Sequence, residues 1–467
     1  MALWSALFIE FWKRTENTTA MKWGTNGYEE MEQVRPQFKG EKIRSAITGH
    51  PALYFSRVSR FYRSVFSQTV ISFLVLIVIA VIAIIFAIRI GISDTGANIG
   101  GVNLGGIVSS ILLALQIQFL NGFFGEIALK LTNFENHRTD TEYEDSLIAK
   151  TFCFQFVNSF ASLFYIAFVK PYIPTIDPCM PGGCMTELQV TLGTIFLTRL
   201  AMGNLTEIGI PLLKSYFEES KRTTASNKLR DSIHRETMEQ VNILRQSKDS
   251  GVKIPDHFAN TVNLDSDAVM NDLTLKYEMS EIEKTFTMTV YDVMLGTFDD
   301  YAEMAIQFGY TTMFVAAFPL ATVLSFINNY VEIRVDGWKL CHLCRRPEPR
   351  SCEDIGTWLV ILELMSISSI FINSGLIAFT GSNAIDYTWV NRVWIFILIA
   401  CGLFAIRFTV AFLIPDEPEE VQIQLKRREY ITDKIINNIA DEGPDENTGA
   451  NFETPSFIVL KTDDDPM

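Results

Sequence analysis

The chain has few of the side chains on which catalysis depends. Only five of its 467 residues are His, and none of them lies near a Cys or Ser in a pattern that predicts a catalytic triad. No internal repeat and no enzyme-type motif stands out. These absences argue against an enzyme, and the net charge of −15 gives no reason to expect a nucleic-acid partner.

Long apolar runs, by contrast, are abundant. Hydrophobic residues make up 48% of the chain, and 35 residues are Phe. A helix needs about 20 apolar residues to cross a bilayer, and only helices and closed barrels satisfy their own backbone in lipid. The length of the runs favours helices, so we expect an all-α, polytopic membrane protein. The predicted spans are 68–90, 104–131, 149–170, 187–214, 354–379 and 389–414, besides a further run at 300–336.

Three loops contain neither Lys nor Arg, namely 92–103, 171–186 and 380–388. Because Lys and Arg are enriched in cytoplasmic loops, these three loops are predicted to lie outside. Arg89, at the outer end of its span, does not fit this pattern. The segments that carry basic residues, and are therefore predicted to lie inside, are 13–66, 132–148, 215–285, 337–353 and the carboxyl-terminal region after 414.

The run at 300–336 must therefore cross the membrane an even number of times, since both of its flanks are basic. Two crossings do not fit into its apolar part when each needs about 20 residues. The sequence predicts a helical hairpin, with helices at 286–317 and 320–340 and a tip near Phe318 and Pro319.

This hairpin places acids at membrane depth. Asp300 and Glu303 are spaced i,i+3, and Glu332 and Asp336 are spaced i,i+4, so each pair lies on one helix face. Glu207 lies near the inner end of the span 187–214. Five converging carboxylates would repel one another unless cations joined them, and Ca²⁺ accepts six to eight oxygen ligands. We expect two Ca²⁺ ions here; the alternative is five separate acids that are salt-bridged or reach the interface.

Several motifs resemble those of the anoctamin family of Ca²⁺-activated channels and phospholipid scramblases. They occur in the family's order over nearly the whole chain. They are FIEFWKR (8–14), ENHRTDTEYEDSL (135–147), FQFVNSFASLFYIAFVK (154–170), PGGCMTEL (181–188), NLTEIGIP (204–211), IQFGYTTMFVAAFPLA (306–321), INNYVEIRVD (327–336) and IPDEPEEV (414–421).

The resemblance implies a homodimer with ten membrane helices per subunit and two Ca²⁺ ions between the sixth, seventh and eighth of them. The implied Ca²⁺ ligands are the same five acids. The family often has an Asn one turn before the first Glu, where this chain has Gly203, with Asn204 adjacent as a weaker candidate ligand. A further, weaker Ca²⁺ site is implied at Glu10, Asp416, Glu419 and Glu420, for which a solvated helix end is the alternative.

Measured against the family, the chain is expected to be amino-terminally truncated, with eight full membrane helices and one partial one. The expected order is a remnant of a membrane helix (1–12), a cytoplasmic segment (13–66), groove-forming membrane helices (67–214), a cytoplasmic segment (215–285), the hairpin with the Ca²⁺ ligands (286–340), a cytoplasmic loop (341–353), the last two membrane helices (354–415) and a cytoplasmic acidic tail (416–467).

The family's groove, between the third and seventh helices, carries ions or lipid headgroups. The corresponding spans here are unusually polar; polar side chains also hold membrane helices together, which is the alternative. The candidate groove residues are Gln116, Gln118, Asn121, Glu126, Gln155, Asn158, Lys170, Thr194, Thr198 and Arg199. The expected function is Ca²⁺-activated passage of chloride or other anions, of lipid headgroups, or of both. The alternatives are a scramblase without channel activity and a non-transporting tether or receptor.

Two further expectations concern pairs of residues. Cys179 and Cys184, in the outer loop 171–186, could form a disulfide because that face is oxidising. Glu363 and Arg407 lie at similar depth in the last two spans, so they are predicted to form an ion pair; the alternative is that Arg407 reaches a lipid phosphate at the inner interface. The CHLC sequence at 341–344 allows a zinc site with His342, although free thiols are the preferred interpretation.

Overall fold

The computed structural model describes residues 1–44, 49–94, 98–99, 102–180, 182–205, 288–381 and 387–436, with single positions between 209 and 246. Most of the predicted segment 215–285 and the tail beyond 436 lie outside the described residues. The chain divides into two units, Met1–Asp416 and Glu417–Met467. The second contains one described helix, α15 (Glu419–Ile435).

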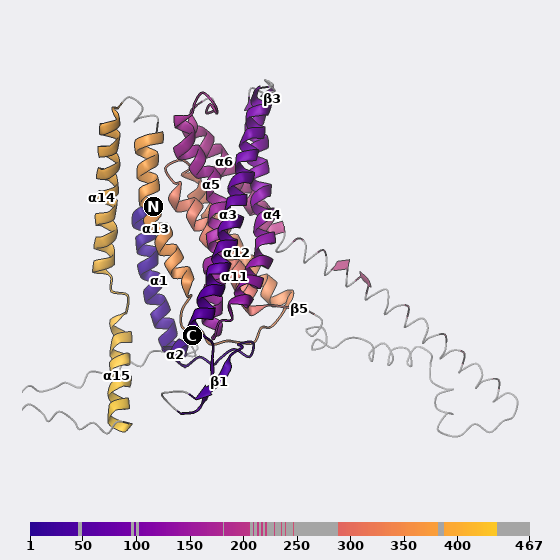
Figure 1. Ribbon diagram of the computed structural model, residues 1–467, viewed down its shortest axis with the longest axis vertical. Coiled ribbons are helices and arrows are strands. Elements are labelled where there is room, and N and C mark those ends of the chain that lie inside the picture. The colour runs from indigo at the N-terminus through magenta and orange to yellow at the C-terminus, as the bar shows by residue number, and fades with distance from the viewer. Residues whose placement is uncertain are drawn as a thin grey trace, which may run out of the picture. The chain divides into compact units, whose positions relative to one another are not determined.

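The first unit is a bundle of long helices that lie side by side (Figure 1). We call the end that carries β1 and β5 the basic end, and the opposite end, near β3, the disulfide end. The helices are α1 (Ala2–Trp23), α2 (Tyr28–Met31), α3 (Arg57–Asp94), α4 (Leu104–Glu135), α5 (Asp140–Phe164), α6 (Cys184–Asn204), α11 (Val293–Met313), α12 (Leu320–His342), α13 (Thr357–Gly375) and α14 (Trp389–Leu413).

Short irregular elements extend these helices. α5 continues as a π-helix, η1 (Tyr165–Val169), and a 3-10 turn, η2 (Lys170–Tyr172), while α13 continues as the π-helix η4 (Leu376–Thr380). The two π-helices are joined where Thr380 Oγ1 donates to the carbonyl of Ala167 at 2.6 Å.

In the part of the chain that the structure describes, three two-stranded sheets accompany the helices. β1 (Glu41–Arg44) and β2 (Pro51–Tyr54) are antiparallel, with Glu41 opposite Tyr54, and β3 (Asn98–Ile99) pairs antiparallel with β4 (Val102–Asn103). β5 (Thr289–Val290) pairs in parallel with β6 (Cys344–Arg345).

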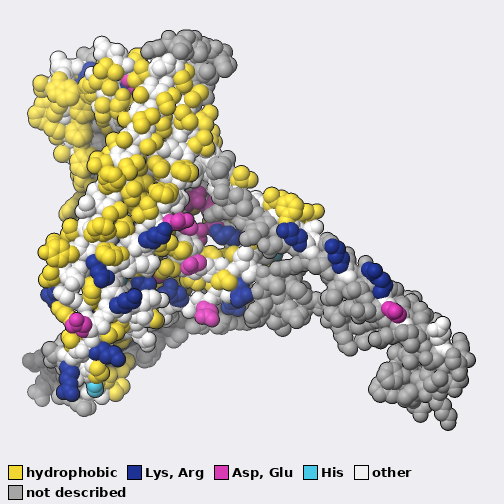
Figure 2. All heavy atoms as spheres, turned by 45° about the vertical axis from the view of Figure 1, so that its right-hand side comes forward, with side chains coloured by type: hydrophobic (Ala, Val, Ile, Leu, Met, Phe, Trp, Pro, Cys, Tyr) yellow, Lys and Arg dark blue, Asp and Glu magenta, His cyan; other side chains and the backbone are white. Residues whose placement is uncertain are grey.

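Among the described residues, five helical segments are long and apolar enough to cross a membrane: Arg57–Ile92, Val108–Glu135, Asp140–Tyr172, Thr357–Thr380 and Trp389–Leu413. The prediction of a mostly helical polytopic membrane protein is confirmed, whereas the count of eight full spans stays a prediction. On the face shown in Figure 2, hydrophobic side chains cover the upper part of the bundle and most Lys and Arg side chains lie on its lower part.

The loop predicted at 132–148 is much shorter than expected, because α4 extends to Glu135 and α5 begins at Asp140. Side chains satisfy the first backbone N–H groups of α5. The Thr139 hydroxyl accepts a hydrogen bond from Glu142 N at 3.2 Å, and the Glu32 carboxylate accepts one from Asp140 N at 3.1 Å. A remote acid thus helps to start this helix.

The predicted helical hairpin is present as α11 and α12, joined by residues 314–319. α11 begins at Val293 rather than 286, because the Asp292 carboxylate caps it by accepting from Met294 N at 3.0 Å. At the other end, Asn373 of α13 holds the tip: its Oδ1 accepts from Ala316 N at 3.0 Å, and its Nδ2 donates to Thr312 O at 2.7 Å. β5 precedes α11 and β6 follows α12, so their pairing joins the two open ends of the hairpin.

The core of the bundle is largely aromatic. The Phe124 and Phe154 rings stack with centroids 3.9 Å apart, joining α4 to α5, and Phe160 lies 4.8 Å from the Tyr310 ring of α11. Gly309 makes this approach possible, since a Cβ there would lie 2.6 Å from Phe160 Cζ. Small residues of this kind let membrane helices approach closely.

The predicted ion pair between Glu363 and Arg407 is wrong. Lys13 Nζ of α1 lies 2.8 Å from Glu363 Oε1, and Arg407 Nη1 of α14 donates to Ser366 Oγ at 2.6 Å. α13 and α14 do pack together, but α1 also packs against both and supplies the basic partner of Glu363. The Ser366 hydroxyl also lies 2.9 Å from Ser5 Oγ, which joins all three helices.

A charge swap tests the observed pair. Lys13→Glu adds a carboxylate beside those of Glu10, Glu363 and Asp416, so we expect it to lower the free energy of unfolding by about 1–2 kcal/mol, between the values for exposed and buried pairs. Adding Glu363→Lys restores opposite charges and should recover part of the loss in a thermal-unfolding measurement. The single variant Glu363→Lys should also lower the unfolding temperature, because it faces Lys13. Adding Arg407→Glu to that variant should not restore the lost stability. Recovery by the second double variant instead would contradict the observed pairing.

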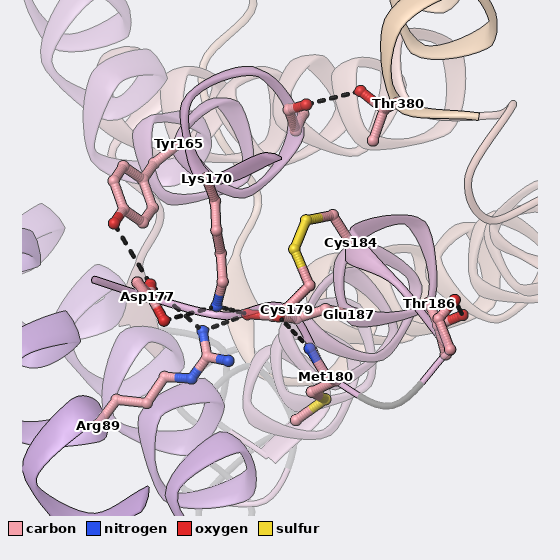
Figure 3. Close-up of a disulfide and its surroundings, with 12 residues drawn as sticks. Arg89, Tyr165, Lys170, Asp177, Cys179, Met180, Cys184, Thr186, Glu187 and Thr380 are labelled. Carbon is pink, nitrogen blue, oxygen red and sulfur yellow. Dashed lines mark hydrogen bonds and ion pairs between the residues drawn. A yellow bond between two sulfur atoms is a disulfide. The ribbon is translucent and has the colours of Figure 1, made fainter. Parts of the chain in front are cut away.

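The disulfide end is held by a buried network of four charges. Lys170 Nζ lies 3.0 Å from Asp177 Oδ1 and 2.7 Å from Glu187 Oε1. Arg89 of α3 pairs with Glu187 and lies 4.0 Å from Asp177 Oδ2 (Figure 3). All four side chains are buried. Arg89, which did not fit the charge pattern of the loops, is therefore neutralised within the bundle.

The predicted disulfide between Cys179 and Cys184 is present beside this network (Figure 3). It closes the short turn before α6, within which Met180 N donates to Glu187 Oε2 at 3.0 Å. The crosslink and the hydrogen bond together fix Glu187 where both basic side chains reach it.

We expect Glu187→Gln to lower the free energy of unfolding by about 3–5 kcal/mol, because it leaves two buried cations short of a partner. Asp177→Asn should cost less, since Lys170 and Arg89 keep their contacts with Glu187. Chemical denaturation in detergent micelles measures both. The control is Glu126→Gln, an exposed carboxyl on α4, with an expected change within about 0.5 kcal/mol. Equal losses for Glu187→Gln and Glu126→Gln would contradict a buried network.

Candidate metal site and membrane groove

The hairpin brings Asp300 of α11 and Asp336 of α12 to the same cationic group. Lys339 Nζ lies 3.6 Å from Asp300 Oδ1 and 3.1 Å from Asp336 Oδ1. The Tyr291 hydroxyl donates to the other oxygen of Asp300 at 3.3 Å. Burial, followed by the Asp300 carboxylate, raises the pKa of Tyr291 to about 12, so this donor keeps its proton at neutral pH.

α6 meets the hairpin at the same level. A Cβ on Gly203 would lie 3.2 Å from Glu303 Oε1, so the glycine leaves room for this carboxylate against the helix backbone. α6 also contacts α12. The three helices that were predicted to share a site therefore approach one another, but Glu207 lies outside the described residues, and so does the side chain of Asn204.

Asn328, which was not among the predicted site residues, precedes Glu332 by one helical turn and is buried. Its Nδ2 donates to Gln307 Oε1 at 2.8 Å, which ties α12 to α11 just beyond the acids. Gln307 also bonds Asn329 through its Nε2. The i,i+4,i+8 spacing of Asn328, Glu332 and Asp336 was the signal that could have identified it.

The donor chemistry of this region fits a hard cation. Carboxylate and amide oxygens are the ligands that Ca²⁺ prefers, and an ammonium group already lies between two of the carboxylates. Within the described part of the chain, however, no three or more His, Cys, Asp or Glu side chains form a group that could hold a metal ion. The five-acid site with two ions therefore stays a prediction.

The second predicted Ca²⁺ site surrounds a lysine. Lys13 Nζ lies 3.8 Å from Glu10 Oε2 and 3.7 Å from Asp416 Oδ1, in addition to its contact with Glu363. Glu419 and Glu420 begin α15 in the second unit, so their position relative to Glu10 is not described.

Three of the candidate groove residues join α4 to α5. Asn158 is fully buried, and its Nδ2 donates to Asn121 Oδ1 at 2.8 Å and to Ile117 O at 3.1 Å, while its Oδ1 accepts from Gln116. Such bonds between helices are the alternative that the sequence left open for these polar side chains.

The other groove candidates differ in exposure and partners. Glu126 is exposed on α4, and the Arg199 guanidinium of α6 lies 5.8 Å from the Tyr310 ring centre. Lys170 is fully buried in the network at the disulfide end. Half-buried positions are occupied by Gln118, Gln155, Thr194 and Thr198.

A cavity of about 760 Å³ opens at the basic end, between α1, α2, α5, α11 and α13. Many of its lining residues are acids, but several of them accept backbone N–H groups. Glu353 accepts from Gly27 N at 2.8 Å, and Asp145 accepts from Thr357 N at 2.9 Å. These acids satisfy the starts of helices, so they have a structural role.

Cysteines near the basic end are free thiols. They are Cys341, Cys344 and Cys352, in and after α12. Partial burial of the thiol, followed by the neighbouring Asp354, raises the pKa of Cys352, so less of this thiol is present as the reactive thiolate.

Comparison with known proteins defines the class to which this arrangement belongs. A family model described as "Anoctamin: Calcium-activated chloride channel" matches residues 1–428. The chain is therefore a member of the anoctamin family. Its candidate membrane spans agree with a multi-pass membrane protein.

Individual relatives agree with this assignment. Anoctamin-4 of Mus musculus is 32% identical over 407 residues, which cover 82% of this chain and 38% of that protein. Anoctamin-7 of Homo sapiens is 28% identical over 544 aligned positions, covering 99% of this chain and 53% of that protein. Anoctamin-10 of Homo sapiens is 29% identical, covering 92% of this chain and 57% of that protein. The chain thus spans about 40–60% of the length of these relatives.

Proposed function

We propose that this chain is a Ca²⁺-activated membrane transport protein that passes anions, lipid headgroups or both along a groove between its helices. The observation that carries the proposal is the convergence of Asp300 and Asp336 on one cation, at the level where Glu303 meets α6. Carboxylates at membrane depth are costly and mark functional sites. The match to a family model described as a calcium-activated chloride channel supports the same conclusion.

In this proposal Glu207, Asp300, Glu303, Glu332 and Asp336 hold two Ca²⁺ ions, with Asn204 as a weaker ligand. Bound Ca²⁺ would supply positive charge that offsets the repulsion between the acids. The acids come from three helices. Without Ca²⁺, their repulsion favours separation of α6 from the hairpin, and bound Ca²⁺ would remove this repulsion and favour close packing. Gly203, which contacts Glu303, lets the α6 backbone approach or leave without a side chain in the way.

The exposure of Glu126 supports the proposal that lipid headgroups are among the transported species. It is exposed on α4 within a candidate membrane span, and a charge on such a surface requires water or a polar headgroup beside it. A scramblase without channel activity is thus the second candidate function. A tether or receptor is disfavoured, because such a role does not require acids inside the membrane.

Reconstitution of the purified chain in liposomes tests the proposal. We expect Ca²⁺ to increase anion flux, lipid scrambling or both, and the pattern distinguishes the channel from the scramblase. Glu303→Gln and Asp336→Asn should each raise the Ca²⁺ concentration for half-activation by roughly tenfold or more, since ligand charge sets Ca²⁺ affinity. The matched control is Glu348→Gln, an exposed acid outside the hairpin. The proposal fails if neither flux nor scrambling responds to Ca²⁺ in a folded sample.

We also propose that two copies associate through α14 and that the carboxyl terminus is cytoplasmic. α14 is largely exposed, with Trp389, Trp394, Phe408 and Phe412 on its surface. Single cysteines placed along α14, after replacement of the exposed Cys401, should crosslink at positions one turn apart. Absence of crosslinks along the whole helix, in a sample that light scattering shows to be dimeric, would contradict this interface.

A further inference from the structure

We infer that Lys339 is a built-in competitor of the activating cation: its ammonium group occupies the acid site of the hairpin and must leave when Ca²⁺ binds. This inference rests on the proposed Ca²⁺ site, and it names a residue that sets the affinity of that site. It assigns Lys339 a regulatory role rather than a merely structural one.

The geometry of Lys339 supports this role. Its Nζ bridges two helices, with Asp336 Oδ1 at 3.1 Å on its own helix and Asp300 Oδ1 at 3.6 Å on α11. Both contacts are made to carboxylates that are proposed ligands of the metal ion. An ammonium group and a Ca²⁺ ion held at the same two carboxylates would repel each other, so binding of one opposes binding of the other.

The charge of the hairpin explains why a lysine belongs there. α11 and α12 contain five acids, Asp299, Asp300, Glu303, Glu332 and Asp336, but only two Lys or Arg residues, Arg334 and Lys339. Arg334 is exposed and donates to the Tyr330 hydroxyl at 3.0 Å, away from Asp336. Lys339 therefore supplies the positive charge at the acids when Ca²⁺ is absent.

The position of Lys339 also allows it to leave. It lies in the last turn of α12, three residues before the helix ends at His342, and the β6 strand follows directly. A lysine has a flexible four-carbon stem and a compact charge, so it can turn toward water without movement of its helix. The same contact that steadies the Ca²⁺-free hairpin thus opposes Ca²⁺ binding.

Calcium titration of purified chains by calorimetry tests this inference without any transport assay. Lys339→Gln should tighten Ca²⁺ binding by roughly tenfold or more, because no ammonium group has to be displaced and a repelling charge is removed. Lys339→Arg keeps the charge and should stay within about threefold of the unmodified chain. The matched control, Arg334→Gln, removes a positive charge from the same helix but away from the acids, and should also stay within about threefold.

Thermal unfolding gives a second readout. Without Ca²⁺, Lys339→Gln should unfold at a lower temperature than the unmodified chain, because Asp300 and Asp336 then lack their shared partner. Addition of Ca²⁺ should raise its unfolding temperature more than that of the unmodified chain, as tighter binding requires. A residue with only a structural role would lower the unfolding temperature in both conditions without changing the Ca²⁺ affinity.

The outcomes separate the inference from the proposed function. If Ca²⁺ does not bind the unmodified chain, or binds equally well after Asp336→Asn, the proposed site itself is wrong. If Ca²⁺ binds in an Asp336-dependent manner but Lys339→Gln leaves the affinity unchanged or weaker, only the competition is wrong. An equal gain for Arg334→Gln would also overturn it, because the effect would then come from the net charge of the helix.

Discussion

The cost of a charge inside a membrane-spanning bundle governs this structure more than any other interaction. A buried ion loses its hydration, and only a partner of opposite charge with good geometry offsets that loss. At the disulfide end, Arg89 and Lys170 are met by Asp177 and Glu187. Near the basic end, Lys150 Nζ lies 2.6 Å from Glu135 Oε2 and joins α5 to α4. Each of these contacts fixes how neighbouring helices align along their length.

The sequence was sufficient to predict the hairpin and the disulfide because both follow from local constraints. The basic residues on either side of 300–336 predicted two crossings and hence a helical hairpin, which the structure contains as α11 and α12. Cys179 and Cys184 are five residues apart, so the chain itself brings them together. The helix boundary at Val293 was missed because it depends on a single capping side chain, Asp292.

The partner of Glu363 could not be predicted in the same way. The depth of a residue along a helix can be predicted from the sequence. The rotation of the helix about its axis, and which helices from distant parts of the chain pack against it, cannot. Glu363 and Arg407 were placed at the right depth on packed helices, yet α1 supplies Lys13, 350 positions earlier in the chain. The same limit applies to Asn121 and Asn158, whose bond between α4 and α5 gives at least part of the polar groove a packing role.

The balance of charge separates the structural clusters from the candidate functional site. At the disulfide end two basic residues meet two acids, and the cluster is complete without a ligand. The hairpin has a surplus of acids over basic residues, and its Lys339 is shared between carboxylates of two helices. A complete cluster holds one arrangement of helices, since any change exposes an unpaired charge. A cluster with surplus acids gains stability from an added cation, so its helices respond to the cation concentration. In the proposed function, the acid-rich hairpin is therefore the part of the bundle that would respond to Ca²⁺. The balanced network at the opposite end holds the start of α6 through Glu187 without any added cation.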